Sequence, residues 1–472
     1  MGKEETSERV LNEDELKEET KKLSIKEGVS YSIMDGAGLK YISPYALALG
    51  ANNNQIGLLT SVPALIGNFS QLFTSKFMEK YSRKKVIIWG AFLQAIMWLP
   101  LILVGYLYFN KNLSTSLSAW LIIAFYTLIT FFGSFSNPAW NSLMKDVVDK
   151  ESGKYFGKRN KITGIAVLLV MLGSGLVLDL FKENGDIFFG FVILLAISFV
   201  SRTVSAKILS KHYDPNLELK EGYYFSFVDF LKKFRKNNFG KFTLFVSLIN
   251  LATYIASPFF TVYMLKDLNL NYLTYTLITL SSPLSNLLFM PLWGRIADRF
   301  GNLRVLKRTA LLIPLVPFLW FLTFFMGHLN STALIAYLLA VEFMSGMVWA
   351  GFNLSSATFI YDAVTKQRVA ICVAYYNILN GIGTFIGATI GGFISSLKIN
   401  LFGMDAILLI FLISALARFL VYLLMAYKIK EVRPVEEYKR GAFRKEFKNE
   451  LNSILLPPNW KFGIFSIKQE KS

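Results

Sequence analysis

Residues 294–304 read GRIADRFGNLR and stand between two long apolar runs. The stretch contains one acid, three arginines and two glycines. Glycine allows a tight turn, and arginines in short loops favour the cytoplasmic side of a membrane. We therefore expect these residues to form a short cytoplasmic loop between two membrane helices.

A weaker copy lies in the first half of the chain, where residues 75–85 read SKFMEKYSRKK. Glu79 there aligns with Asp298, and Lys85 aligns with Arg304. Both copies resemble the G-x-x-x-D-R-x-G-R-K signature of the major facilitator superfamily, which follows the second helix of each six-helix half. The first copy departs from it, with Ser75 and Ser82 in place of the glycines and Glu79 in place of the aspartate. The resemblance implies two homologous six-helix bundles with the substrate held between them.

The duplication extends beyond the two loops. Asp146 corresponds to Asp362, and Gly164 corresponds to Gly381, at nearly the same offset along the chain as the two loops. Residues 138–160 also look like the inner connection of helices four and five in prokaryotic members of the superfamily. The resemblance covers roughly residues 29–428.

Composition indicates a membrane protein with many spans. The 472 residues are 53% hydrophobic and 15% aromatic, and the apolar residues come in long blocks. A net charge of +18 is compatible with nucleic-acid binding only if the basic residues gather on one soluble face, and here they are distributed between apolar spans. We expect no nucleic-acid partner.

The sequence offers no set of residues for a cofactor or for catalysis. Its one cysteine, Cys372, lies in an apolar run, and its only histidines, His212 and His328, fall in different loops. This excludes an intramolecular disulfide and argues against a zinc or haem site. The absence of a G-x-x-x-x-G-K-[ST] loop argues against ATP as the direct energy source. We expect neither an enzyme nor a bound metal.

Apolar runs of roughly twenty residues, the length that crosses a bilayer as a helix, divide the chain. We predict an all-α membrane protein with a charged tail (1–28), a six-helix bundle (29–209), a polar linker (210–240), a second bundle (241–427) and a basic tail (428–472). The runs lie near 29–50, 55–74, 86–108, 117–138, 162–181, 187–209, 241–264, 272–293, 306–327, 332–354, 369–396 and 403–427.

Basic residues set the orientation, because they sit preferentially on the cytoplasmic side. With a cytoplasmic N-terminus, the inner segments hold 43 of the 50 Lys and Arg residues, and the outer loops hold four. The predicted protein is therefore a multi-pass cell-membrane protein with both termini in the cytoplasm. Its basic tail, 428–472, is expected to lie against anionic lipid or to be partly disordered.

Polar stripes at helical spacing mark the helices that face water. They occur on helices one, four, seven and ten, which the resemblance places around the central cavity. A single serine or threonine in a membrane helix more often bonds its own backbone or joins two helices, so the stripes carry more weight than their members. The stripes contain Tyr31, Ser32 and Asp35; Thr127, Thr130, Ser134, Asn137 and Asn141; Asn250, Thr253, Tyr254, Ser257 and Thr261; and Glu342, Ser345, Trp349, Asn353 and Ser356.

Four charged residues lie at membrane depth: Asp35, Lys40, Glu342 and Arg418. Each costs about 2.5 to 3.5 kcal/mol at the centre of a lone helix, so each needs a partner or water. Glu342 is the leading candidate for a protonation or substrate site, and the alternative is a permanent ion pair with Lys40 or Arg418. Asp35 precedes Gly36 and Gly38, which permit local unwinding.

Helix eleven carries glycines four residues apart, at Gly383, Gly387 and Gly391. This small-xxx-small ridge allows close helix packing and sliding, and it equally suits a plain packing interface.

The superfamily resemblance also implies a cytoplasmic gate. There the acid of the signature loop helps to hold the two halves together when the cavity faces outward. By position, Glu79 and Asp298 would take that role. Their basic partners would be Arg83, Lys84, Arg299 and Arg304.

We therefore predict a secondary transporter that moves a small solute by alternating access with proton coupling. The alternatives are a uniporter, and a transport-inactive receptor or scaffold on the same fold. The expected partners are a small-molecule substrate, protons and membrane lipid. Hydroxyl and amide groups suit a sugar or polyol, while the acids with Trp349 and Tyr254 suit an organic cation, and the sequence leaves both classes open. The candidate substrate or proton site comprises Asp35, Lys40, Asn250, Tyr254, Glu342, Trp349 and Asn353.

Overall fold

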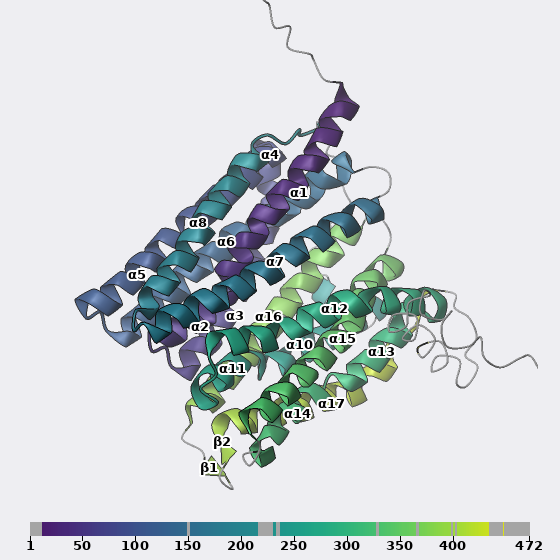
Figure 1. Ribbon diagram of the computed structural model, residues 1–472. Helices are drawn as coiled ribbons and strands as arrows, with labels where there is room; N and C mark the ends of the chain where they lie inside the picture. Colours follow the sequence, from purple (N-terminus) through teal and green to yellow (C-terminus); the bar gives the residue numbers. More distant parts are fainter. Residues whose placement is uncertain are drawn as a thin grey trace, which may run out of the picture. The chain divides into compact units, whose positions relative to one another are not determined.

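A computed structural model gives the fold of the chain (Figure 1). It describes residues 12–148, 152–215, 230–232, 237–326, 330–364, 368–397, 400–401, 404–433 and 447. The side chain of Glu79, His328, most of the 210–240 linker and most of the basic tail lie outside the described residues.

The chain divides into two compact units, and each is described by itself. The first unit comprises Met1–Glu221 with Thr261–Thr276, and the second comprises Gly222–Phe260 with Leu277–Ser472. Helices before residue 221 are α1 (Glu13–Ala37), η1 (Leu39–Tyr41), α2 (Ile42–Ala48), α3 (Asn53–Lys80), α4 (Arg83–Ile96), α5 (Trp98–Lys111), α6 (Thr115–Val147), α7 (Ser152–Glu183) and α8 (Ile187–Leu209).

The rest of the described chain is also helical, apart from one short pair of strands. Strand β1 (Asn400–Leu401) pairs antiparallel with β2 (Met404–Asp405). The helices are α10 (Asn238–Tyr254), α11 (Ser257–Val262), η2 (Tyr263–Asp267), α12 (Tyr272–Phe300), α13 (Asn302–Leu312), α14 (Leu315–Leu322), η3 (Thr323–Met326), α15 (Ser331–Ala363), α16 (Val369–Ser396), α17 (Ala406–Met425) and η5 (Ala426–Lys428).

All twelve predicted membrane helices are present as helices, several of them broken within the span. Among the described residues, ten helical segments are long and apolar enough to cross a membrane. The other two predicted spans correspond to α1 with α2 and to α12, whose polar residues lower their mean hydropathy. Two predicted ranges, 187–209 and 369–396, coincide with α8 and α16.

The first membrane helix starts well before its apolar run. The Asn12 side chain accepts from the Glu15 N–H, the Glu15 carboxylate accepts from the Asn12 N–H, and this capping box fixes the start of α1 at Glu13. The helix then continues without interruption to Ala37, so the predicted tail boundary at residue 28 falls inside it. Tyr155 Oη donates to the Lys21 carbonyl, which holds the extension against α7.

The signature stretch 294–304 is not the loop that we expected. Helix α12 runs through it to Phe300, and α13 begins at Asn302. Only Gly301 turns the chain, with φ of 90°, a conformation that suits glycine. The prediction that both glycines serve a turn is wrong for Gly294, which is helical. In the first copy, Ser82 replaces the turning glycine and caps α4 by accepting from Lys85 N–H.

The glycine ridge of α16 is a tight helix interface. A Cβ added at Gly383, Gly387 or Gly391 would lie less than 3.0 Å from a backbone carbonyl oxygen of α10 or the residue after it. Those oxygens belong to Ser247, Leu251 and Ile255, which are themselves four residues apart. Matching four-residue spacings on the two helices therefore bring their backbones into contact.

Candidate functional site

The first membrane helix breaks beside two of the predicted site residues. Helix α1 ends at Ala37, and the chain resumes as η1 at Leu39. A Cβ at Gly38 would overlap the Trp98 ring, so only glycine fits at the break. Asp35 is partly buried in the last turn of α1, and none of the residues that the structure describes donates a hydrogen bond to it. Exposed Lys40 is the charge that attracts it electrostatically.

Glu342 lies in a different setting. Its carboxylate accepts a hydrogen bond of 2.9 Å from Trp320 Nε1, which joins α15 to α14. The Trp320 ring is fully buried and packs against both Phe260 and Phe411. Arg418 acts on the carboxylate electrostatically. Glu342 is therefore held through an aromatic donor.

Arg418 is a packing residue that donates hydrogen bonds to backbone carbonyls where helices end. Its side chain is 1% exposed, and its guanidinium donates to the carbonyls of Ile313 and Thr253. Ile313 follows the end of α13, and Thr253 lies at the end of α10. Carbonyls at helix ends lack partners within their own helix. Arg418 supplies donors to both, and its Nε also donates to Ser414 Oγ.

The remaining predicted site residues lie on α10 and α15 in the second unit. Asn250 Nδ2 donates to Asn380 Oδ1 over 3.0 Å, which links α10 to α16. Tyr254 and Trp349 are partly buried, and Asn353 is exposed. Sequence reasoning missed Asn380, although its spacing of four residues from Tyr376 places two polar groups on one face of α16.

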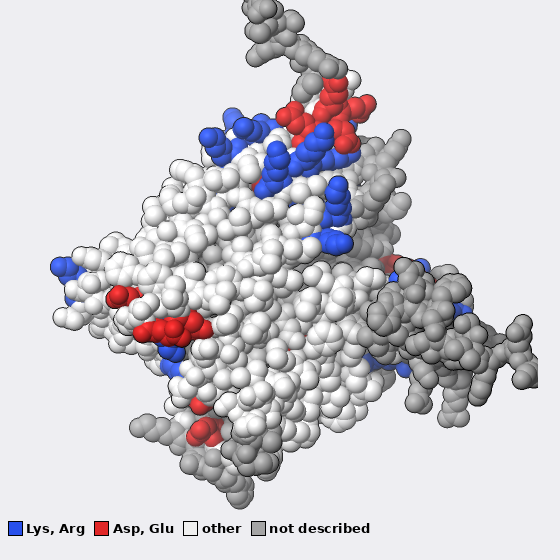
Figure 2. Space-filling view, in the orientation of Figure 1, with Lys and Arg blue, Asp and Glu red and all other residues white. Residues whose placement is uncertain are grey.

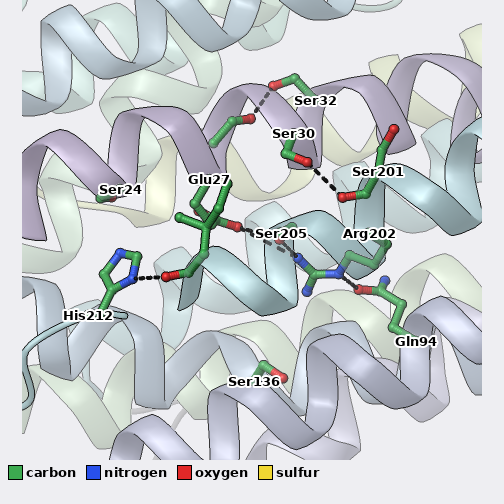
Figure 3. Close-up of polar contacts among 12 residues, drawn as sticks. Ser24, Glu27, Ser30, Ser32, Gln94, Ser136, Ser201, Arg202, Ser205 and His212 are labelled. Atoms are coloured by element: carbon green, nitrogen blue, oxygen red, sulfur yellow. Dashed lines mark hydrogen bonds and ion pairs between the residues drawn. The ribbon is translucent and has the colours of Figure 1, made fainter. Parts of the chain in front are cut away.

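Sequence reasoning also missed a buried charged network in the first unit (Figure 3). Glu27 on α1 is 4% exposed, and it accepts from Ser205 Oγ on α8 at 2.9 Å. Arg202 Nη1 lies 3.6 Å from the same carboxylate, and Arg202 Nε donates to Gln94 Oε1 on α4 at 2.7 Å. On the other carboxylate oxygen, Arg159 Nη2 on α7 donates over 3.2 Å. Thus Glu27 joins α1 to α7 and α8, and Arg202 extends the network to α4.

On the surface, as in the sequence, charged residues gather at the helix ends and apolar residues lie between them. Figure 2 shows lysines and arginines gathered where α4 begins, with acidic residues on the first turns of α1, while the long side of the helices is white. An uncharged band between charged ends is the pattern of a helix bundle set in a bilayer.

Comparison with known families gives a match over most of the chain. The family model described as Major Facilitator Superfamily matches residues 29–253 and 242–467. The chain belongs to this superfamily. It is a multi-pass membrane transporter, and the prediction of two pseudo-symmetric six-helix bundles is confirmed.

Relatives of this transporter include an uncharacterized MFS-type transporter of Methanocaldococcus jannaschii. The two are 24% identical over 374 residues, which is 76% of this chain and 88% of the relative. The multi-drug resistance efflux pump PmrA of Streptococcus pneumoniae is 31% identical over 159 residues, 34% of this chain and 36% of the pump.

Two solved structures share the fold. The nucleoside transporter NupG gives a TM-score of 0.64 at 16% identity, covering 88% of this chain and 100% of NupG. A bacterial homologue of the iron transporter ferroportin, in an inward-facing state, gives 0.68 at 13% identity and covers 87% of this chain and 98% of the homologue.

In the transporter's first signature copy, Arg83 is a buried structural residue. Its guanidinium pairs with Asp146 on α6 and, at 3.0 Å, with Asp214 beyond α8. Lys84 contributes its backbone N–H, which donates to Asp214 at 3.1 Å. Both Arg83 and Lys84 therefore hold the start of α4 within the first unit.

The second signature copy has the same plan with different residues. Asn302 donates from its side-chain amide to Asp362 on α15, and Leu303 N–H donates to Glu431 at 2.9 Å. Asp298 and Arg299 are exposed on the last turns of α12, and Arg304 is partly buried in α13. The exposed charges of the second signature copy are thus Arg295, Asp298 and Arg299.

Proposed function

We propose that this transporter is a proton-coupled secondary transporter of a small polar solute, and that Asp35 carries the coupled proton. The mechanism is alternating access between two six-helix bundles. The observation that carries the proposal is the position of Asp35, in the final turn of α1 next to the break at Gly38 and without a hydrogen-bond donor among the described residues.

The surroundings of Asp35 suit exchange of a proton. An ionised carboxylate at membrane depth is stabilised only by a counter-charge or by water. Lys40 supplies an exposed counter-charge past the break, and a broken helix leaves free backbone groups near the carboxyl. Movement of the break changes both, so proton affinity and conformation are linked at this residue.

Glu342 is the second candidate for the coupled proton. It lies on α15, but Trp320 Nε1 donates a hydrogen bond to one of its oxygens. A carboxylate held by a fully buried donor can exchange a proton in each transport cycle only if that hydrogen bond is broken or weakened. We therefore rank Glu342 below Asp35 for coupling and assign it to the packing of α14 against α15.

The proposed orientation places both termini in the cytoplasm, as the distribution of basic residues predicts. Asp298 and Glu79 then lie at the cytoplasmic side, where we propose that they act in a gate between the bundles, with Arg299 and Arg304 as partners. Substituted cysteines at residue 12 and in the 111–114 connection, in a Cys372→Ser background, should label from opposite sides of the membrane.

The names of the similar proteins mention three cargoes of different chemistry: drugs, nucleosides and iron. The test therefore uses a panel. Proteoliposomes containing the protein and an internal pH-sensitive dye are given sugars, amino acids, organic acids and lipophilic cations under an imposed pH gradient. We expect one class to drive proton flux, and we expect Asp35→Asn to abolish this flux while solute exchange continues.

Glu342→Gln is the matched control, because it also removes one intramembrane carboxylate. It should keep solute-driven proton flux. Solute uptake that is indifferent to the pH gradient in the unmodified protein would instead establish a uniporter. A panel in which no solute crosses the membrane would favour the receptor or scaffold.

A further inference from the structure

A buried cluster of charged side chains around Glu27, in the first unit, has no role in the proposed proton coupling. One buried carboxylate is shared there by two guanidinium groups, those of Arg159 and Arg202 (Figure 3 shows Glu27 with Arg202). A carboxylate carries one negative charge, so the three side chains together hold one excess positive charge. Charges removed from water need compensation close by, which makes this cluster receptive to an anion.

Arg202 is not available for that anion. Its side chain is only 5% exposed; Nε donates to Gln94, and Nη1 donates to Ser205 and lies 3.6 Å from Glu27. The ring of Tyr31 covers the guanidinium, with its centroid 5.0 Å from Arg202 Cζ. Arg202 therefore completes the internal network and holds Glu27 in place.

Arg159 is available. It uses Nε for the Ser24 carbonyl and Nη2 for Glu27, both at 3.2 Å. An arginine has five N–H donors, so these two bonds to described residues leave three, and its side chain is 14% exposed. The remaining donors include both on Nη1, on the side of the guanidinium away from the bonds to α1.

The orientation of Arg159 is fixed from two directions. The Trp140 ring of α6 lies against it, with the ring centroid 4.7 Å from Cζ. On the α1 side, Gly28 allows close approach, because a Cβ there would lie 2.8 Å from Arg159 Nη2. A planar guanidinium fixed by stacking and hydrogen bonds loses little freedom when it binds a carboxylate or a phosphate.

Further donors lie on the helix that carries Trp140, α6. Asn137 and Asn141 stand on either side of Trp140 along the helix, and both are exposed. Amide groups can donate to a second oxygen of an anion or bind the rest of a polar solute.

We propose that Arg159 binds an anionic group, a carboxylate or a phosphate, of the transported solute. This assignment rests on the proposed transport function and narrows its substrate class. Trp140 and Glu27 are positioning residues for Arg159. A phospholipid headgroup presents the same chemistry, and the experiment separates it from a soluble anion.

The test is a thermal-stability titration of the full-length protein in neutral detergent at constant ionic strength. The probes are inorganic phosphate, glycerol phosphate, lactate, succinate and citrate as sodium salts, with sodium chloride as reference. A ligand that binds the folded state raises the melting temperature by mass action. We expect at least one probe to give a saturable increase beyond that of chloride.

Substitutions assign the effect to Arg159. Arg159→Gln should abolish the increase, and Arg159→Lys should raise the half-maximal concentration about tenfold, because the fork geometry is lost while the charge remains. Lys158→Gln removes a neighbouring exposed charge and should leave the titration unchanged. The melting temperature and elution volume of each variant without probe show whether it folds.

Three results would overturn the proposal. The first is a probe-induced increase of equal size in Arg159→Gln. The second is the lack of a saturable increase with every soluble anion. The third is stabilisation by phosphatidylglycerol in mixed micelles without any by the soluble probes, which would make the site a headgroup site. Because the titration needs no proton gradient, its failure is distinct from a failure of proton coupling.

Discussion

Arg83 and Asn302 occupy equivalent positions in the two signature copies, and each contacts the equivalent aspartate of its own unit. Arg83 pairs with Asp146, and Asn302 donates to Asp362. The next residue in each copy, Lys84 or Leu303, donates its backbone N–H to a carboxylate beyond the last helix of its unit, Asp214 or Glu431. The duplication has kept the contacts while replacing an ion pair with a neutral donor.

This difference predicts unequal effects of substitution. Arg83→Asn should lower the free energy of unfolding by about 1–3 kcal/mol, because it leaves two carboxylates without their buried guanidinium. Asn302→Ala should cost less, about 1–1.5 kcal/mol, because the uncharged amide gives the Asp362 carboxylate one hydrogen bond and no ion pair. Thermal unfolding in detergent measures both, and equal losses would contradict the assigned asymmetry.

The acid stability of the transporter should depend on His212. The imidazole is 2% exposed just beyond α8, and burial lowers its pKa, although the Ile208 carbonyl opposes this effect. The folded state then prefers the neutral ring. Its stabilising contribution is complete above the unfolded pKa of about 6.5 and is lost as pH falls toward the folded value.

The measurement is the melting temperature between pH 8 and pH 5. His212→Gln should flatten the decline below pH 6.5 relative to the unmodified protein. His328→Gln removes the other histidine and is the matched control. An identical decline in His212→Gln would show that carboxylates alone govern the acid response.

The glycine ridge predicts a strong packing defect. In Gly387→Ala the new Cβ would overlap the Leu251 carbonyl oxygen, so α10 and α16 would have to separate. We expect a loss of about 1–3 kcal/mol, as for overpacked cores. Gly173→Ala is the control, because no described residue places an atom within 4 Å of its Cβ, and it should be neutral or slightly stabilising.

The proposed gate predicts a change in conformational population. Asp298→Asn removes an exposed acid from the last turns of α12 and should favour the inward-open state, lower turnover and leave substrate affinity almost unchanged. Labelling of a cysteine at Asn353 from the cytoplasmic side, in a Cys372→Ser background, reports that population. Unchanged labelling would count against the gate.

Sequence periodicity was sufficient to predict where the helices lie, but not which side chains contact one another. Apolar runs record the thickness of a bilayer, and for this reason the range of α8 was predicted to the residue. The polar stripe on α15 was visible in the sequence. A stripe does not reveal, however, that Trp320 Nε1 donates a hydrogen bond to Glu342. Glycine at 294 suggested a turn, although helical hydrogen bonding continues to Phe300.

The Glu27 network was missed for a similar reason. Glu27 lies just before the predicted span 29–50 and Arg202 lies near the end of the predicted span 187–209, where charges are ordinary, and the two are far apart in the sequence. Only the packing of α1 against α7 and α8, and of α8 against α4, brings the charges together. Long-range pairing of this kind leaves no periodic pattern in a single sequence.

The uninterrupted helix α1 connects the membrane-embedded Asp35 to a solvent-exposed end at Asn12. Its 25 residues span about 38 Å, from the capping box at Asn12 to the turn that holds Asp35. A stiff rod transmits tilt and rotation along its length, so events at the membrane-embedded end should displace the solvent-exposed end. A fluorophore attached near Asn12 would then report proton binding at Asp35 without any probe placed inside the bilayer.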